Sequence, residues 1–299
     1  MKRILLVGCG DIALRVAPLL RARYRLFGLT RNAARDPVLR AAGITPVPGD
    51  MDDAGSLQRL AGLAHIVLHF APPPSAPPLT RGGREGFAVD ARTRKLLAAL
   101  SQGTLPQSLI YISTSGVYGD CAGAHVAETH PLNAHNPRAQ RRVDAENQIR
   151  NWAARNGVMA SILRVPGIYA ADRWPIQRLQ QGTPAIVADE DSYTNHIHAD
   201  DLAHIVLAAM RSAKPNRVYH ASDDSDLKMG DYFDEVADAF CLPRPPRLPR
   251  VEVQRAVSPG LWSFMNESRR LSNTRMKKEL KVALRYSTVA DALALIGNR

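Results

Sequence analysis

Ile4-Leu5-Leu6-Val7-Gly8-Cys9-Gly10-Asp11-Ile12-Ala13 is the stretch that decides the fold of this chain. Residues 4–7 form a continuous apolar run, which is typical of a strand buried on both faces of a parallel sheet. Apolar residues at helical spacing continue to residue 23, and Pro18 is expected to kink or shorten this helix. The sequence therefore predicts a strand, a glycine turn and a helix in direct succession.

The glycine turn has the spacing G-x-G-x-x-A of a dinucleotide-binding motif. Gly8 permits the tight turn, Gly10 lets a pyrophosphate approach the backbone, and Ala13 allows the helix to pack closely on the sheet. The phosphates would rest on the unpaired amides at the helix N-terminus. A strand-to-helix turn that is merely tight is the alternative.

Strands and helices alternate along the first 165 residues. We expect strands at 3–7, 25–30, 44–47, 66–70, 109–112 and 160–165, and helices at 11–23, 57–63, 85–100 and 138–155. This alternation predicts an α/β fold with a doubly wound parallel sheet, right-handed crossovers and helices on both faces. A proline-rich loop follows the strand at 66–70, at the edge of the sheet where such folds bind ligands.

The pattern weakens after residue 165, so we predict a domain boundary there. Residues 1–165 would form the dinucleotide-binding domain and residues 166–299 a smaller substrate domain, with 198–222 returning to the first sheet. Expected elements are helices at 202–211, 229–240, 259–271 and 288–296 and a strand at 217–220. Asp200 or Asp201 is the expected cap of the helix at 202–211.

Composition and charge narrow the function classes. The 299-residue chain carries a net charge of +11, from 39 basic and 28 acidic residues. It has no membrane-spanning apolar stretch, and its three cysteines are too scattered for a disulfide framework, so a cytoplasmic protein is expected. Residues 241–299 hold twelve basic and four acidic residues. They form either a solvated basic face or a pocket for an anionic substrate, and no motif points to nucleic acid.

The end of the second strand indicates which dinucleotide is bound. An acidic residue would be expected there to bind the ribose 2′-hydroxyl, yet the chain has Thr30 and Arg31, with Arg35 nearby. A guanidinium pairs with a 2′-phosphate in fork geometry, so we predict NADP over NAD. Asp50, after the third strand, either accepts from the adenine amino group or caps a turn.

Four further motifs follow in order and suggest a family. They are Gly49-Asp50, Ser113-Thr114-Ser115-Gly116-Val117-Tyr118-Gly119, Leu163-Arg164-Val165-Pro166-Gly167-Ile168-Tyr169 and His198-Ala199-Asp200-Asp201-Leu202. With the glycine turn, they resemble the extended short-chain dehydrogenase/reductases, the NAD-dependent epimerases and dehydratases of nucleotide sugars. The resemblance covers roughly residues 1–240. It implies a Rossmann domain, a smaller substrate domain, and hydride transfer assisted by a Ser/Thr, a Tyr and a Lys.

The chain departs from that family at the Tyr-x-x-x-Lys pair. Counting back from Glu146 places Arg142 at the lysine position and Arg138 at the tyrosine position. An arginine keeps its proton in proteins, so it cannot serve as a general base. Three interpretations stay open: another acid or base, for which Tyr118, Tyr169 and His135 are candidates; a substrate that needs no tyrosine; or NADP binding without turnover, as in redox-sensing regulators.

The resemblance implies a set of site residues. Thr114, Ser115 and Tyr118 are the candidate catalytic residues. The candidate cofactor-binding residues are Gly8, Gly10, Asp11, Ile12, Ala13, Arg31, Asp50, Met51, Ala71, Pro72, Thr114, Arg142, Pro166 and Ile168. From the charge of the C-terminal segment alone, Arg269 or Arg270 is expected to bind a substrate diphosphate. His196 and His198 are not expected to bind metal.

The superfamily also suggests an assembly and a partner. The expected partner is a small molecule, such as a nucleotide sugar. Dimers through two long helices are usual in the superfamily, which implies a homodimer, although arginines crowd one of these helices here.

Overall fold

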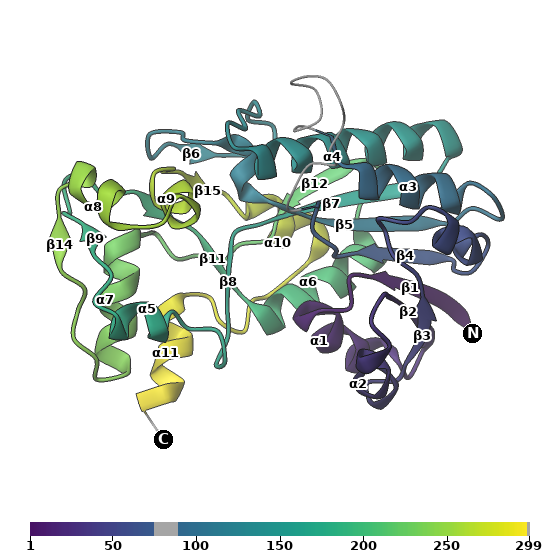
Figure 1. Cartoon of the computed structure of the whole chain (residues 1–299), viewed down its shortest axis with the longest axis horizontal. Coiled ribbons are helices and arrows are strands. Elements are labelled where there is room, and N and C mark those ends of the chain that lie inside the picture. Colours follow the sequence, from purple (N-terminus) through teal and green to yellow (C-terminus); the bar gives the residue numbers. More distant parts are fainter. Residues whose placement is uncertain (75–88, 298–299) are drawn as a thin grey trace.

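A seven-stranded parallel sheet forms the centre of the protein (Figure 1), whose computed structural model describes residues 1–74 and 89–297. The strand order is β12-β7-β5-β4-β1-β2-β3, and every neighbouring pair is parallel. The strands are β1 (Lys2–Val7), β2 (Tyr24–Thr30), β3 (Ile44–Pro48), β4 (Ile66–His69), β5 (Ser108–Thr114), β7 (Met159–Val165) and β12 (Arg217–His220). The predicted doubly wound fold is confirmed.

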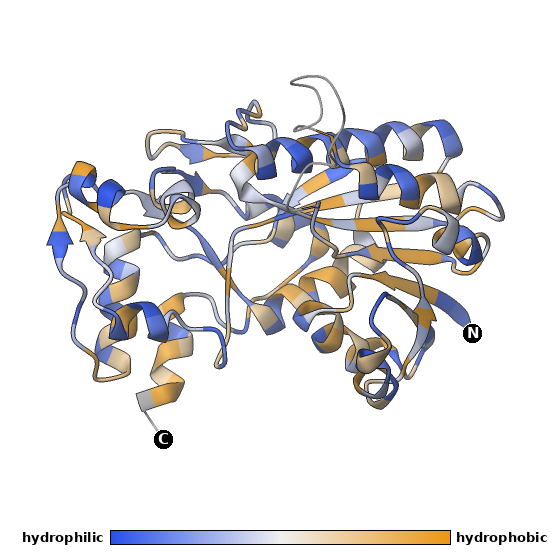
Figure 2. Ribbon diagram, in the orientation of Figure 1, coloured by the Kyte–Doolittle hydropathy of each residue, from blue (hydrophilic) through white to orange (hydrophobic). Residues whose placement is uncertain are grey.

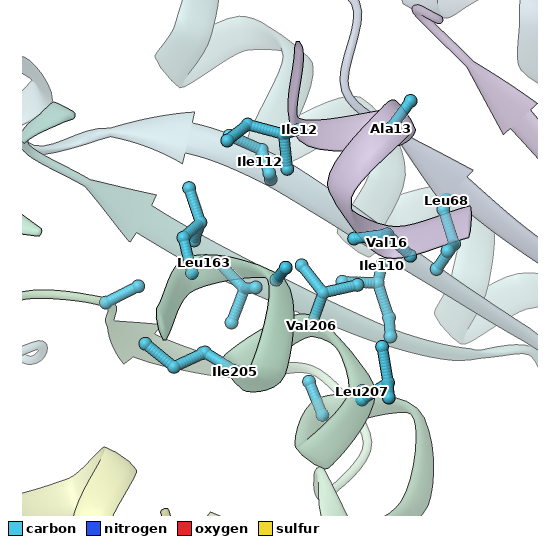
Figure 3. Close-up of a cluster of buried hydrophobic side chains, with 14 of the residues drawn as sticks. Ile12, Ala13, Val16, Leu68, Ile110, Ile112, Leu163, Ile205, Val206 and Leu207 are labelled. Atoms are coloured by element: carbon cyan, nitrogen blue, oxygen red, sulfur yellow. The ribbon is translucent and has the colours of Figure 1, made fainter. Parts of the chain in front are cut away.

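Helices cover both faces of the sheet. Successive side chains of a strand point to opposite faces, so the apolar strands present apolar side chains on both sides. Leu6 packs in one apolar cluster with α1 (Asp11–Leu20) and α6 (Ala199–Ser212), whereas Leu5 packs in another with α3 (Ala91–Leu100) and α4 (Pro137–Asn156). Figure 3 shows α1 and α6 carrying Val16 and Val206 toward Ile110 of the sheet. Apolar residues run along the central strands in Figure 2. These strands are buried on both sides, as their apolar runs predict.

The second region lies at the far end of the molecule from the N-terminal strands (Figure 1). Its apolar cluster joins α5 (Ile176–Gln180), α7 (Met229–Ala239) and α11 (Val289–Gly297). Its other elements are two-stranded pairs and short helices: β8 (Gly167–Tyr169) with β11 (His196–His198), β9 (Ala185–Ile186) with β14 (Arg247–Leu248), β10 (Tyr193–Thr194) with β13 (Leu227–Lys228), β6 (His125–Val126) with β15 (Arg270–Leu271), α8 (Arg250–Ala256) and α9 (Pro259–Met265). Helix α10 (Thr274–Leu280) instead packs against α6 and β12.

Several predicted helices differ in the structure. Residues 57–63 contribute to a 3₁₀ helix, η2 (Gly55–Leu60), instead of an α-helix, and the helix predicted at 259–271 ends at Met265, after which Arg270–Leu271 pairs with β6. The first helix ends at Leu20, two residues beyond Pro18. The helix predicted at 85–100 begins at Ala91, and its residues 85–88 lie outside the described part of the chain.

The predicted cap of α6 is also wrong. The ring nitrogen Nδ1 of His198 accepts from the amide of Asp200 at 3.2 Å and caps this helix. The carboxylate of Asp201 instead accepts from the amides of Arg285 and Tyr286, both at 2.9 Å, and ties the C-terminal segment to α6.

No helix in the described ranges is both long and apolar enough to cross a membrane. Among the α-helices of the described ranges, α2 (Asp36–Ala41), α5, α8 and α10 were not predicted, and neither were the two-stranded pairs. These four helices are short, with at most two buried residues each, so their apolar periodicity is weak.

Candidate functional site

The glycine turn connects β1 to α1 at the carboxyl edge of the sheet. Gly8 has a φ of +94°, and a Cβ atom there would lie 2.4 Å from the backbone nitrogen of Ala71. Gly10 precedes the first residue of α1, and a Cβ atom on it would meet nothing within 4 Å. Glycine at position 8 is therefore required by the fold, whereas Gly10 leaves open space where a phosphate can approach the backbone.

A cavity of about 770 Å³ extends from this turn along the ends of the strands. We call it the cofactor cavity. Twelve of the predicted cofactor-binding residues line it: Gly8, Gly10, Asp11, Ile12, Ala13, Arg31, Asp50, Met51, Ala71, Pro72, Arg142 and Ile168. Its wall also contains Arg92, Ile112 and Arg173, which the sequence analysis missed because they come from segments without a recognised motif.

Two arginines stand at the end of β2, where the coenzyme preference is predicted to be decided. The guanidinium of Arg31 is 68% exposed and lies 3.9 Å from a carboxylate oxygen of Asp50. Arg35 donates to the carbonyl oxygen of Cys9 at 3.1 Å, so it lies across the glycine turn. Both line the cofactor cavity, and this end of it is cationic although Asp50 partly offsets the charge.

A second cavity, of about 720 Å³, adjoins the first, and Ile168 and Arg173 line both. We call it the substrate cavity. Thr114, Ser115 and Pro166 lie in its wall, so these three predicted residues face this cavity instead of the first one. The hydroxyl oxygen of Thr114 accepts from the amide of Gly116 at 3.2 Å, which leaves the hydroxyl proton available to a ligand.

Arg138 and Arg142 lie one helical turn apart on α4, each in the wall of a different cavity. Arg142 lines the cofactor cavity and donates to the hydroxyl of Tyr111 at 2.9 Å and to the carbonyl of Ile112 at 2.7 Å. Arg138 lines the substrate cavity, with its guanidinium 4.6 Å from the ring centre of Phe264. Helix α4 therefore contributes one positive charge to the wall of each cavity.

A profile of the NAD dependent epimerase/dehydratase family matches residues 13–221 of this chain. The chain belongs to this family.

Relatives of this epimerase/dehydratase-family protein differ in how far they match. An uncharacterised protein of Schizosaccharomyces pombe is 26% identical over 237 residues, which is 76% of each chain. Human dTDP-D-glucose 4,6-dehydratase is 22% identical over 172 residues, 55% of this chain and 49% of that enzyme.

Solved structures are similar over nearly the whole chain. A functionally unknown conserved protein from Silicibacter pomeroyi DSS has a TM-score of 0.78 and 27% identity, and the match covers 100% of this chain and 99% of that one. UDP-glucuronic acid 4-epimerase from Bacillus cereus, in complex with UDP-glucuronic acid and NAD, has a TM-score of 0.76 and 17% identity, with 99% and 98% covered. At that identity the likeness is one of fold.

Tyr118 lies apart from both cavities of this epimerase/dehydratase-family protein. Its side chain is fully buried, and its hydroxyl lies 2.6 Å from a guanidinium nitrogen of Arg164 and 2.6 Å from Nε2 of His220. Burial raises the pKa of Tyr118 to about 12. The structure therefore does not bring this predicted catalytic phenol to the substrate cavity.

The buried polar cluster around Tyr118 connects α4 to the sheet. Glu146 of α4 forms an ion pair with Arg164 of β7 at 2.7 Å and accepts from the hydroxyl of Ser113 at 2.6 Å. Both charged side chains are at most 4% exposed. This cluster fixes the helix that carries Arg138 and Arg142.

The other candidate groups are divided between the cavity wall and the rest of the fold. His135 and Tyr169 do not line either cavity, and of the two candidate diphosphate ligands only Arg269 lines the substrate cavity. The sequence analysis missed Tyr193 as a wall residue and dismissed His196 only as a metal ligand, yet both line this cavity. His196 is buried, which lowers its pKa to about 3, so its ring is neutral.

Proposed function

We propose that this protein binds NADP in the cofactor cavity. It acts as an oxidoreductase or epimerase, by hydride transfer, on a substrate that carries a carbonyl or hydroxyl group and binds in the adjoining cavity. Nucleotide sugars belong to this class of substrate. The observation that carries the proposal is the junction of the two cavities at Ile168 and Arg173, with Gly10 in one wall and Thr114 in the other. This arrangement would bring a coenzyme and a substrate together at the carboxyl ends of the strands.

The charge of the cofactor cavity and its open space at Gly10 support a dinucleotide as its ligand. The open space at Gly10, next to the N-terminus of α1, suits a pyrophosphate. Arg31 and Arg35 would bind a 2′-phosphate, which favours NADP over NAD, and Asp50 would accept from the adenine amino group. When bound, the nicotinamide supplies or accepts the hydride.

The residues of the chain would then orient the substrate. The free hydroxyl proton of Thr114 would hold the reacting oxygen, with Ser115 beside it. Arg142 would keep a positive field beside the coenzyme, a task that needs charge and no proton transfer. A proton would have to come from water, from the substrate or from a wall residue such as Tyr193.

Calorimetric titration with NADPH and NADH, followed by turnover assays with sugar nucleotides and ketones, tests the proposal. We expect NADPH to bind at least about tenfold more tightly than NADH, since a charge-assisted contact contributes about 1.5 to 3 kcal/mol. Failure of both coenzymes to bind would refute the proposal as a whole.

A second function is favoured by one observation, the presence of Arg138 and Arg142 at the positions where the resemblance predicts the family's Tyr and Lys. Arginine cannot exchange a proton near neutral pH, so the protein would bind NADP as a redox sensor without turnover. Micromolar NADPH binding with no turnover of any substrate in the panel would support the sensor and exclude the enzyme for those substrates.

Three other predictions go with the proposed function. They are the division of the chain at residue 165, a homodimer and a cytoplasmic location. Sedimentation velocity of the purified protein would measure the assembly directly.

A further inference from the structure

Arg138 is exceptional among the arginines of the substrate cavity. Within residues 1–74 and 89–297, no hydrogen bond and no ion pair engages its guanidinium, which lies against the ring of Phe264 at 4.6 Å. The contact with the ring uses none of the N–H groups of the guanidinium in a hydrogen bond, so they are free to donate. The side chain is therefore a charged donor in a cavity wall with no acceptor assigned to it.

The other arginines of this cavity are already engaged. Arg269 pairs with Glu267 at 2.8 Å and donates to the carbonyl of Gly119 at 2.7 Å. Arg173 pairs with Asp11 at 3.0 Å. Arg141 is buried and also has an interaction partner. Within the described ranges, Arg138 is thus the arginine of this wall whose guanidinium makes neither a hydrogen bond nor an ion pair, and a ligand with one negative charge would match it.

Arg138 lies in the cavity where the reacting end of the substrate is expected to bind. Arg138 shares the cavity wall with Thr114, which the proposed function places at the reacting oxygen. One helical turn along α4, Arg142 lines the cofactor cavity. An anion to which Arg138 donates would therefore lie in the same cavity as the carbon that exchanges a hydride.

We propose that Arg138 recognises a carboxylate attached near the reacting carbon of the substrate. This inference rests on the proposed function and specifies its substrate class. A planar carboxylate carries one charge and two oxygens, which match the single fork of one guanidinium. A diphosphate carries more negative charge than the guanidinium of Arg138 compensates.

His196 and Arg269 contribute to the wall of the substrate cavity beside Arg138. Nδ1 of His196 and Nε of Arg269 have no hydrogen-bond partner among the described residues. His196 is 5% exposed and stacks on Tyr232 with ring centres 4.1 Å apart, so its ring is held in place. The neutral ring of His196 adds no charge to the cavity, so it does not compete with Arg138 for an anion.

Calorimetry on the NADPH-saturated full-length protein tests the proposal with three probes. Oxamate carries one carboxylate, oxamide is its neutral amide, and inorganic phosphate is an anion of different shape and charge. We expect oxamate to bind at least about tenfold more tightly than either of the other two, because only oxamate offers a planar monoanionic fork.

Variants of two arginines on the same helix complete the experiment. Arg138→Gln should weaken oxamate binding about tenfold or more. Arg138→Lys keeps the positive charge but not the planar fork, so its affinity for oxamate should lie between that of Arg138→Gln and that of the unaltered protein. Arg155→Gln is the matched control, because Arg155 is exposed in the last turn of α4 and lines neither cavity.

The outcomes separate this inference from the proposed function. Undiminished oxamate binding by Arg138→Gln, equal binding of oxamide, or phosphate binding as tight as oxamate would each overturn the carboxylate assignment. NADPH titration of the same samples provides the second readout. If NADPH binds and oxamate does not, only the carboxylate inference fails, whereas loss of NADPH binding in the unaltered protein refutes the proposed function.

Discussion

The two cavities share a wall but are built in different ways. The cofactor cavity is formed mainly by the residues that directly follow β1, β2, β3 and β4, so short stretches of sequence bring its groups together. The substrate cavity takes residues from segments between Thr114 and Arg269, including β10, α4 and α9. The first is thus a property of local motifs and strand order, and the second depends on how distant segments pack.

The shared support of both cavities is the buried ion pair between Glu146 and Arg164. Replacing Arg164 with Met should lower the free energy of unfolding by about 3–5 kcal/mol, because Glu146 would be left buried without its counter-charge. Urea unfolding measures this loss. Replacing Glu146 with Met as well should recover part of it, and Arg155→Gln should have almost no effect. A loss below about 1 kcal/mol for Arg164→Met would mean that the two cavities do not depend on this pair.

The glycine turn tests whether the cofactor cavity can be altered separately from the fold. Gly8→Val should destabilise the protein by about 3 kcal/mol and abolish NADPH binding, since its Cβ would lie 2.4 Å from the backbone of Ala71. Gly10→Ala should change stability by less than about 1 kcal/mol but weaken NADPH about tenfold, because its methyl group occupies the open approach. Equal effects of the two changes on NADPH binding and on stability would refute this distinction.

The predicted coenzyme preference concerns the cofactor cavity alone. Arg31→Asp should weaken NADPH binding about ten- to a hundredfold and leave NADH binding less affected, because a carboxylate repels the 2′-phosphate. Calorimetry with both coenzymes measures the ratio. Arg25→Asp is the control, since Arg25 is exposed on β2 and lines neither cavity. Unchanged relative affinities in Arg31→Asp would defeat the assignment of NADP.

The contrast between local motifs in the cofactor cavity and distant packing in the substrate cavity explains how much could be predicted from sequence. The sheet and the cofactor cavity follow from apolar runs of strand length and from the turn at Gly8 and Gly10, which are local signals. The position of Tyr118 was not predictable in this way. Residues Ser115–Tyr118 form a 3₁₀ turn that carries its side chain into the interior, where Arg164 and His220 bind it.

The wall residues Tyr193 and Phe264 were missed for a related reason. Tyr193 lies on a two-residue strand, and Phe264 on a seven-residue helix. Neither element is long enough to show periodicity. Their place in the cavity is decided by tertiary packing between segments far apart in the sequence.

One buried histidine near each cavity allows the two regions to be compared by their response to pH. His69, at the end of β4, is 1% exposed, and His196, in the substrate cavity, is 5% exposed. Burial lowers the pKa of each to about 3. The unfolded chain, with a pKa near 6.5 for each histidine, binds protons first as pH falls, so stability decreases from about pH 6.5 toward pH 3.

The expected size of this effect is about 1 kcal/mol for each histidine between pH 6.5 and pH 5.5. His69→Phe and His196→Phe should each remove that much of the acid-induced loss of stability, as measured by urea unfolding at the two pH values. Asp223 changes the stability in the opposite direction as pH falls, because burial raises its pKa to about 7. Asp223 is present in every variant, so its contribution cancels when the variants are compared. If an anion in the substrate cavity stabilises protonated His196, saturating oxamate should reduce the contribution of His196 while leaving that of His69 unchanged. Equal changes at both histidines would mean that the two cavities respond to a ligand as one unit.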